Sequence, residues 1–175
     1  MKQYALISFA LLLASCITQQ QVYNAKKLES GEGILLAQFT CGDLVNSASI
    51  YKTGTGWSKH TGIWNRDAVL RCSNNYNILK LPEGDYYISH FVGMALEREE
   101  NALKFSIVRN KINYIGHINL NVRSQGVKQS PGHKTYNYNY NPTVSNQRNL
   151  AQTYLENELP ELASKYDFSV SIAHK

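Results

Sequence analysis

The chain has 175 residues, of which 43% are hydrophobic and 18% are charged, and its formal net charge is +5. This length suits one domain, and the composition excludes a disordered tail. The positive excess is too small to predict a nucleic-acid partner, although it suits proximity to an anionic membrane or wall. Twelve tyrosines against five phenylalanines favour strands, because aromatic rings fit a pleated, half-buried surface.

The first twenty residues have the layout of a secretory signal. Lys2 precedes an apolar stretch over residues 4–15, and the chain becomes polar from Thr18 onward. A membrane-spanning helix is one alternative, but twelve residues reach only roughly 18 Å, short of the ~30 Å hydrocarbon core. A buried helix of the domain is another, and its apolar character on all faces argues against it. We therefore expect residues 1–15 to be removed on export.

The signal ends in Leu13-Ala14-Ser15-Cys16, which resembles the lipobox of bacterial lipoproteins. This resemblance implies cleavage before Cys16, a diacylglyceryl thioether on its thiol, and an acyl chain such as palmitate on its freed amine. Several acyl chains give stable membrane anchoring where one would not. Ile17 follows the cysteine, which in diderm bacteria resembles lipoproteins sorted to the outer membrane. Ordinary signal cleavage that leaves Cys16 unmodified is the alternative.

Residues 16–31 are polar and predict a lipid-anchored tether, which leaves 32–175 as the folded domain. The chain has three cysteines, an odd number, and acylation of Cys16 leaves Cys41 and Cys72 as a pair. A disulfide between them suits an oxidising exported compartment and would stabilise by roughly 3–4 kcal/mol. Two separate buried thiols are the alternative. We expect no metal, since neither CxxC nor HxxxH occurs and the spacing of the five histidines suits no ligand set.

Apolar periodicity predicts a mostly β domain, with about seven short strands and one late helix. Residues 76–81 and 85–92 are expected to pair around a turn at 82–84, and 103–108 to pair with 112–122. The last of these alternates cleanly, with Ile115 as the exception. Residues 124–133 predict an exposed loop, because they contain two glycines and a proline. Further strands are expected at 33–39, 136–140 and 168–172.

The helix is predicted from four leucines and Tyr154 at helical spacing, starting with Leu150, and Asn146 is its expected N-cap. Pro160 lies inside this pattern, so the helix should kink or end near Leu159. A final strand follows. The sum is a β-sandwich with one C-terminal α-helix and a last strand.

Three short motifs carry a resemblance to a known fold. LKLPEGDYYI at 79–88, FSIV at 105–108 and YIG at 114–116 are similar to the prealbumin-like sandwich domain that recurs in small periplasmic and outer-membrane lipoproteins. The turn at Arg109-Asn110-Lys111 lacks the family's usual glycine, but asparagine tolerates the same left-handed backbone. The resemblance covers about residues 76–122 and implies a prealbumin- or immunoglobulin-like sandwich. It carries no catalytic residues with it.

Enzymatic motifs are weak or missing. Ser49 and Lys52 match S-x-x-K, and Lys52 also begins K-T-G, but one lysine cannot supply two catalytic elements, so chance explains the match. The sequence contains no G-x-S-x-G, H-E-x-x-H or phosphate loop. A thiol hydrolase using Cys41 is conceivable, yet a disulfide would make that thiol inert. We expect no enzyme and no cofactor beyond the acyl chains.

The strongest candidate for function is a stripe of Tyr136, Tyr138 and Tyr140, beside Arg123 and Lys134. Tyrosine combines a rigid apolar ring with a polar tip, which is useful for gripping glycan or peptide. The alternative is a sheet face covered by the late helix, with a helix tyrosine packed on the stripe.

The sequence thus predicts a non-enzymatic binding or assembly module of the cell envelope, held to a membrane, more often the outer one, by its lipid anchor. Its expected partner is an envelope protein or a glycan. An accessory subunit of a secretion or envelope machine is the second hypothesis. A wall- or glycan-acting enzyme is the third.

Overall fold

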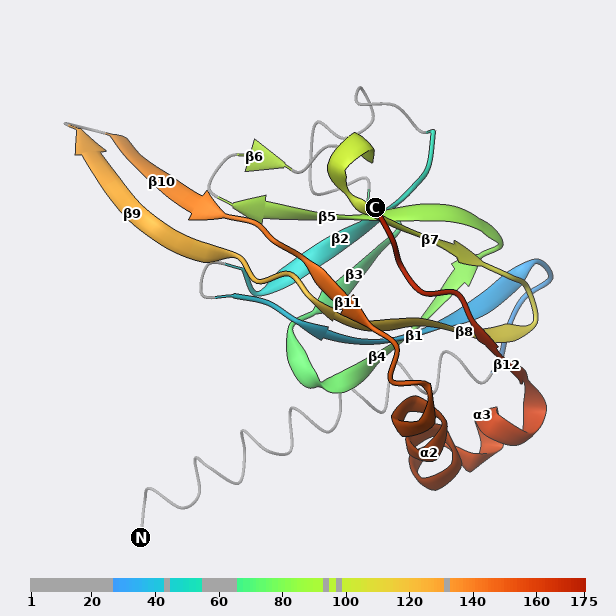
Figure 1. Cartoon of the computed structure of the whole chain (residues 1–175). Coiled ribbons are helices and arrows are strands. Elements are labelled where there is room, and N and C mark those ends of the chain that lie inside the picture. The colour runs from blue at the N-terminus through green and yellow to red at the C-terminus, as the bar shows by residue number, and fades with distance from the viewer. Residues whose placement is uncertain (1–26, 43–44, 55–65, 93–94, 97–98, 131–132) are drawn as a thin grey trace, which may run out of the picture.

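The computed structural model describes residues 27–42, 45–54, 66–92, 95–96, 99–130 and 133–175 (Figure 1). The predicted signal peptide, Cys16 and most of the predicted tether lie outside the described residues, as does His60. The described part of the chain is a β-sandwich with two short C-terminal helices and a final strand. This confirms the predicted fold class.

The first sheet has five strands in the order β11-β8-β1-β4, and β12 also pairs with β8. β1 runs parallel to β8, as β12 does, while β4 and β11 are antiparallel to their neighbours. The bounds of these strands are β1 Glu32–Thr40, β4 Ser73–Pro82, β8 Lys111–Asn119, β11 Thr143–Ser145 and β12 Asp167–Val170.

The second sheet has the order β3-β2-β5-β6, with β7 also paired to β5, and all its pairs are antiparallel. A separate two-stranded hairpin is formed by β9 and β10. The sequence predicted fewer strands than these twelve. The bounds are β2 Ser47–Lys52, β3 Ala68–Arg71, β5 Gly84–Val92, β6 Ala95–Leu96, β7 Leu103–Ile107, β9 Arg123–Ser130 and β10 His133–Asn139.

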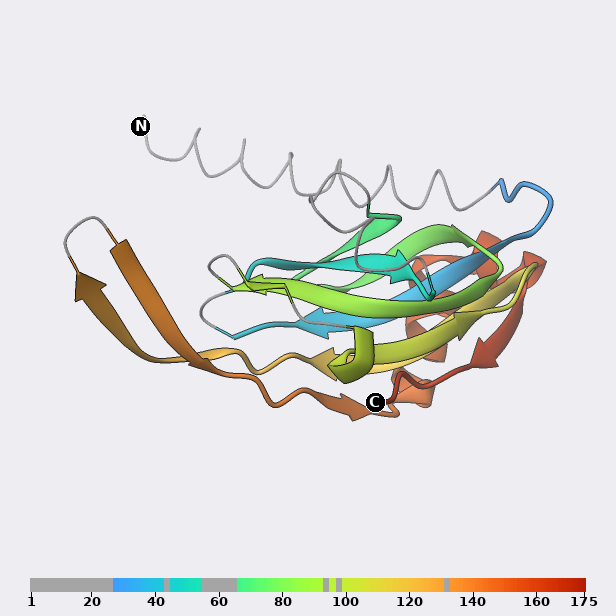
Figure 2. The ribbon, with the colours of Figure 1, turned by 90° about the horizontal axis from the view of Figure 1, so that it is seen from above.

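The main core lies between the two sheets. The first sheet contributes residues such as Leu35 and Ile118, and the second contributes residues such as Ile50 and Phe105, all at most 2% exposed. A second apolar cluster lies on the outer face of the first sheet, where α2 (Arg148–Glu158) and α3 (Pro160–Lys165) pack. In the described part of the chain, α2 and α3 thus form a third layer on the first sheet, and a short 3-10 helix, η3 (Glu99–Asn101), lies beside β5 of the second. Figures 1 and 2 show the helices at one end of the sandwich and the hairpin projecting from the other.

The helix divides where the sequence predicted a break: α2 ends at Glu158, Leu159 follows, and Pro160 begins α3. The N-cap residue is Gln147 and not Asn146, although the Asn146 Oδ1 accepts a hydrogen bond of 3.2 Å from the Arg148 N–H. Leu150 is 62% exposed, so the prediction that it shares the buried face is wrong.

The two predicted strand pairs are wrong, since β4 and β5 lie in different sheets, and so do β7 and β8. The reason is visible at the first connection. The Glu83 N–H donates to the Gly31 carbonyl beside the first sheet, whereas the Asp85 carbonyl accepts from the Thr53 N–H beside the second. At the second connection, Asn110 has a φ of 56°, the left-handed backbone that the sequence predicted there.

The second connection is fixed by a buried side chain, Asn113. Its Oδ1 accepts from the Val108 N–H at 3.0 Å, and its Nδ2 lies 3.2 Å or less from the carbonyl oxygens of Ile34, Val108 and Lys111. One fully buried amide thus satisfies backbone groups that a hairpin ladder would otherwise pair.

The predicted uninterrupted alternation over 112–122 is also wrong, because β8 contains a bulge. Leu36 pairs with Tyr114, but Gln38 pairs with His117, so β8 carries one extra residue. Gly116 lies in this bulge with a φ of 112°. Tyr114 therefore faces the helices, whereas Ile115 faces the core between the sheets, which explains the exception seen in the sequence.

Candidate binding surface

Most of the segment predicted as an exposed loop, 124–133, is instead β-strand: residues 124–130 belong to β9, and His133 begins β10. β9 pairs antiparallel with β10 from Ser130↔His133 to Arg123↔Asn139. Among the described strands, these two pair only with each other. The loop prediction rested on glycine and proline, but Gly126 lies inside β9 at a register shift, with a φ of 141°. Residues 131–132, which join the strands, lie outside the described residues.

The hairpin projects from the body of the sandwich. In Figures 1 and 2 its two strands extend beyond both sheets, at the end opposite α2 and α3. β10 spans seven residues, which corresponds to about 23 Å at ~3.3 Å per residue. A two-stranded ribbon is at best marginally stable in water without support. A projecting ribbon of this kind suits docking, because contacts with a partner can stabilise its two strands.

The register divides the predicted surface residues between the two sides of the ribbon. Lys134, Tyr136 and Tyr138 occupy alternate positions of β10, which is the arrangement of residues that share one side of a strand. Arg123 pairs with Asn139, at the position next to Tyr138, and therefore belongs to the opposite side. Lys134 is thus grouped with two tyrosines, and Arg123 is not.

Tyr140 lies beyond the end of β10, at the base of the hairpin. Its side chain is partly buried and packs against the main core, and the Lys175 Nζ lies 5.7 Å from its ring centroid. Tyr140 therefore contacts the body of the sandwich at the base of the hairpin. Arg123, by contrast, is exposed, and its Nε donates to the Asn121 Oδ1 at 2.9 Å.

The late helix covers a different surface from the tyrosine stripe. Tyr154 of α2 packs on Tyr76 of β4, with ring centroids 4.5 Å apart, on the outer face of the first sheet. The apolar cluster around α2 contains residues of β1, β4 and β8. The backbone of β10 lies at the opposite end of the sandwich from α2 (Figures 1 and 2).

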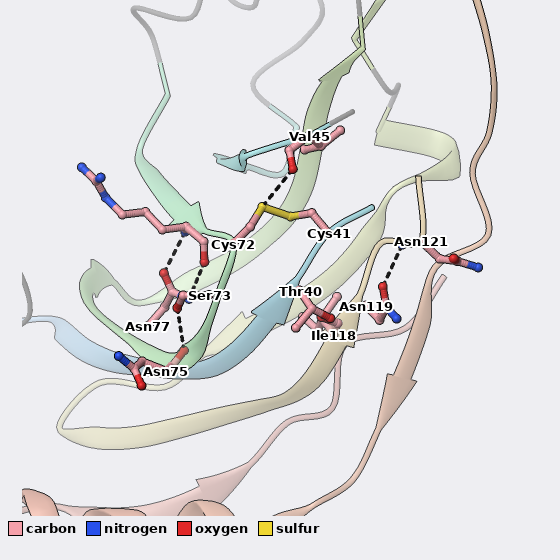
Figure 3. Close-up of a disulfide and its surroundings, with 11 residues drawn as sticks. Thr40, Cys41, Val45, Cys72, Ser73, Asn75, Asn77, Ile118, Asn119 and Asn121 are labelled. Carbon is pink, nitrogen blue, oxygen red and sulfur yellow. Dashed lines mark hydrogen bonds between the residues drawn. A yellow bond between two sulfur atoms is a disulfide. The ribbon is translucent and has the colours of Figure 1, made fainter. Parts of the chain in front are cut away.

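The predicted disulfide between Cys41 and Cys72 is present, with Cα atoms 5.6 Å apart (Figure 3). Cys41 directly follows β1 of the first sheet. Cys72 lies between β3 of the second sheet and β4 of the first. The Cys72 sulfur also lies 3.5 Å from the Val45 carbonyl oxygen. As a disulfide, Cys41 offers no thiolate nucleophile.

The disulfide lies at the end of the sandwich from which the hairpin projects. The Leu120 N–H donates to the Thr40 carbonyl at 3.0 Å, so the last residue of β1 lies beside the approach to β9. A Cβ atom on Gly42 would lie only 1.8 Å from the Val122 carbonyl oxygen, so the backbones touch there. The covalent link therefore braces the root of the hairpin.

The S-x-x-K match falls on a single strand, β2. Ser49 and Lys52 lie three positions apart on β2, and such positions point to opposite faces of a strand. No group of three or more His, Cys, Asp or Glu side chains suited to a metal ion occurs in the described part of the chain. Within the same residues, no helix is both long and apolar enough to cross a membrane.

Comparison with known proteins found no match to this chain among protein-family models, curated proteins or solved structures. The geometry of the hairpin and the motifs of the N-terminus therefore carry the functional argument.

Proposed function

We propose that this chain is a lipid-anchored lipoprotein of the bacterial cell envelope, and that it is a non-enzymatic binding or assembly module. The membrane is engaged through acyl chains on Cys16, and the outer membrane is the proposed location in a diderm cell. The β9–β10 hairpin, with Tyr136 and Tyr138, is the proposed docking element for an envelope protein or glycan.

The observation that carries the proposal is the placement of the hairpin relative to the entry of the chain. β1 starts at Glu32, beside the helices, and ends at Thr40, beside the hairpin root. Nine residues of strand separate these ends by about 30 Å at ~3.3 Å per residue. A domain tethered through residues 16–31 therefore presents the hairpin at the end far from its attachment (Figure 1).

The point where the chain enters the domain is held by polar contacts. The Glu32 Oε2 accepts from the Glu29 N–H at 2.7 Å and from the Lys80 Nζ at 3.1 Å. These contacts, the Glu29 N–H foremost, hold the pKa of Glu32 below its ordinary value. Lys80 also donates to the Lys27 carbonyl at 3.2 Å, so residues 27–32 lie fixed on the first sheet.

The test is removal of the hairpin. Because Ser124 and Tyr138 are register partners, residues 125–137 can be replaced by Asn-Gly, which favours a two-residue hairpin turn. We expect this variant to fold and to lose the partner captured by mild crosslinking in cells. Leu150→Ser, at an exposed apolar position on α2, is the matched control and should retain the partner. Full capture by the shortened variant would contradict the proposal.

The second candidate, an accessory subunit of a secretion or envelope machine, predicts a different capture result. A subunit has one protein partner in fixed stoichiometry, whereas a general binding module captures several partners or a glycan. The third, a wall- or glycan-acting enzyme, predicts clearing of wall polymer in a zymogram. A thiol mechanism at Cys41 is not favoured, because the disulfide removes the thiolate that would act as the nucleophile.

A further inference from the structure

The hairpin has two open edges. β9 and β10 pair with each other and with no other described strand, so each has a row of outward backbone N–H and C=O groups without a strand partner in the described structure. β9 is interrupted by the bulge near Gly126, whereas β10 continues without an extra residue from His133 to Asn139. β10 therefore offers the more regular edge for an added strand.

The charged residues in this part of the sequence have one sign. Residues 101–155 contain no aspartate or glutamate, although the chain has 13 such residues in all. The same segment contains seven lysines and arginines, of which Arg123, Lys128 and Lys134 belong to the hairpin strands. A partner of negative charge would be steered to this edge and held in register by it.

Two occupants other than an acidic partner fit less well. A second copy of the chain would bring the same positive strands together, and like charges across paired strands are destabilising. Lysines and a bulge on edge strands are also typical of proteins that avoid pairing with themselves. The membrane that holds the anchor lies, under the proposed function, beyond the opposite end of the domain.

We infer that the β10 edge receives an extended acidic segment of a partner protein as an additional strand. This inference rests on the proposed docking role of the hairpin. Backbone hydrogen bonds to His133–Asn139 hold the segment, as in other cases of strand addition. Every second residue of the segment then lies on the side that carries Lys134, Tyr136 and Tyr138, where acidic and apolar side chains are favoured.

The test uses the full chain in detergent and a fluorescent ten-residue peptide in which glutamate alternates with threonine and valine. Two matched peptides serve as controls: one has lysine in place of each glutamate, and one keeps the glutamates but is N-methylated at alternate backbone positions. We expect the acidic peptide to bind and to protect β10 amides from hydrogen exchange. N-methylation should weaken binding by about tenfold or more, since two lost hydrogen bonds amount to that factor. The lysine peptide should bind more weakly still.

Several results would overturn the inference. Equal binding of the N-methylated peptide would mean that charge alone attracts it, and equal binding of the lysine peptide would mean that acidity is irrelevant. Hairpin-dependent dimers, or preferential binding of the hairpin to phosphatidylglycerol vesicles or a polyuronate, would assign a different occupant. If no peptide binds but the hairpin-shortened variant loses its captured partner, this inference fails and the proposed function stands. If the shortened variant keeps that partner, the proposed function fails.

Discussion

The Tyr86 hydroxyl donates a hydrogen bond of 2.8 Å to the Pro82 carbonyl, across the connection by which the chain passes from the first sheet to the second. Both residues belong to the LKLPEGDYYI segment at 79–88, so the Tyr86 side chain closes the turn formed by its own segment. A tyrosine that bonds back to the backbone a few residues upstream is a known corner device of β-sandwiches. Its ring is buried in the main core, 5.7 Å from the Phe105 ring.

Tyr86→Phe should keep the ring and lose this bond. We expect the free energy of unfolding to fall by about 1 kcal/mol, and the melting temperature by about 2–4 °C, because the Pro82 carbonyl loses its partner. Tyr154→Phe is the control, since Tyr154 packs on Tyr76 at the outer face of the first sheet, away from this connection. Equal melting temperatures for wild type and Tyr86→Phe would contradict the corner role.

Alkaline pH should destabilise the fold through buried tyrosines. Burial, with smaller effects of nearby carboxylates, raises the pKa of Tyr86 and of Tyr87 to about 12, from the ordinary 10. A raised folded-state pKa means that the stabilisation is complete below pH 10 and is lost as the pH rises toward 12. Urea unfolding across this range should show a falling free energy, with a smaller fall in Tyr86→Phe. A flat profile would show that these phenols ionise as freely in the folded state as in the unfolded one.

The disulfide should account for a large share of the stability. Replacing both Cys41 and Cys72 by serine opens a loop with a sequence separation of 31, which costs about 3–4 kcal/mol in the chain-entropy model. Thermal unfolding of the oxidised wild type against the double variant measures this loss. Mass spectrometry of the unreduced protein should find the domain two hydrogens lighter than its reduced form. Two thiols that alkylate freely in the native protein would contradict the link.

The tyrosine stripe should divide into a binding part and a structural part. Replacing Tyr136 and Tyr138 by serine should weaken partner binding by more than about 1 kcal/mol with nearly unchanged thermal stability, since β10 is outside both sheets. Tyr140→Ser should instead lower the melting temperature, because that ring packs against the core. Binding measured with the captured partner and differential scanning fluorimetry separate the two. If the double variant of Tyr136 and Tyr138 unfolds, those rings belong to a core and the prediction is wrong.

The sequence predicted the fold class because strand patterns and turn motifs are local properties. It also located the break at Pro160, the left-handed Asn110 and the disulfide, each of which depends on one or two residues. Strand pairing was different, since β4 pairs with β1, and β8 pairs with β1, β11 and β12, none of which is its neighbour along the chain. A turn such as Pro82–Gly84 has nearly the same residues whether it joins neighbours or crosses between sheets.

The candidate surface was predicted only in part for a similar reason. The alternation of tyrosine and asparagine identified a strand at 136–140, but Gly126 and the Pro131-Gly132 pair concealed its partner strand. Gly126 lies at the register shift of β9, which the sequence does not distinguish from a glycine in a loop. Tyr140 contacts Lys175 and the main core. These residues are distant in the sequence, so no local pattern could predict the contacts.

Metabolic labelling with radioactive palmitate tests the central claim, anchoring through Cys16, most directly. We predict that the wild-type chain incorporates the label, and that Cys16→Ala incorporates none and accumulates as an uncleaved precursor. Cys41→Ser is a matched control, because its cysteine lies in the folded domain and should leave labelling unchanged. Acyl label that persists in Cys16→Ala, or a wild-type chain that never acquires it, would contradict the account.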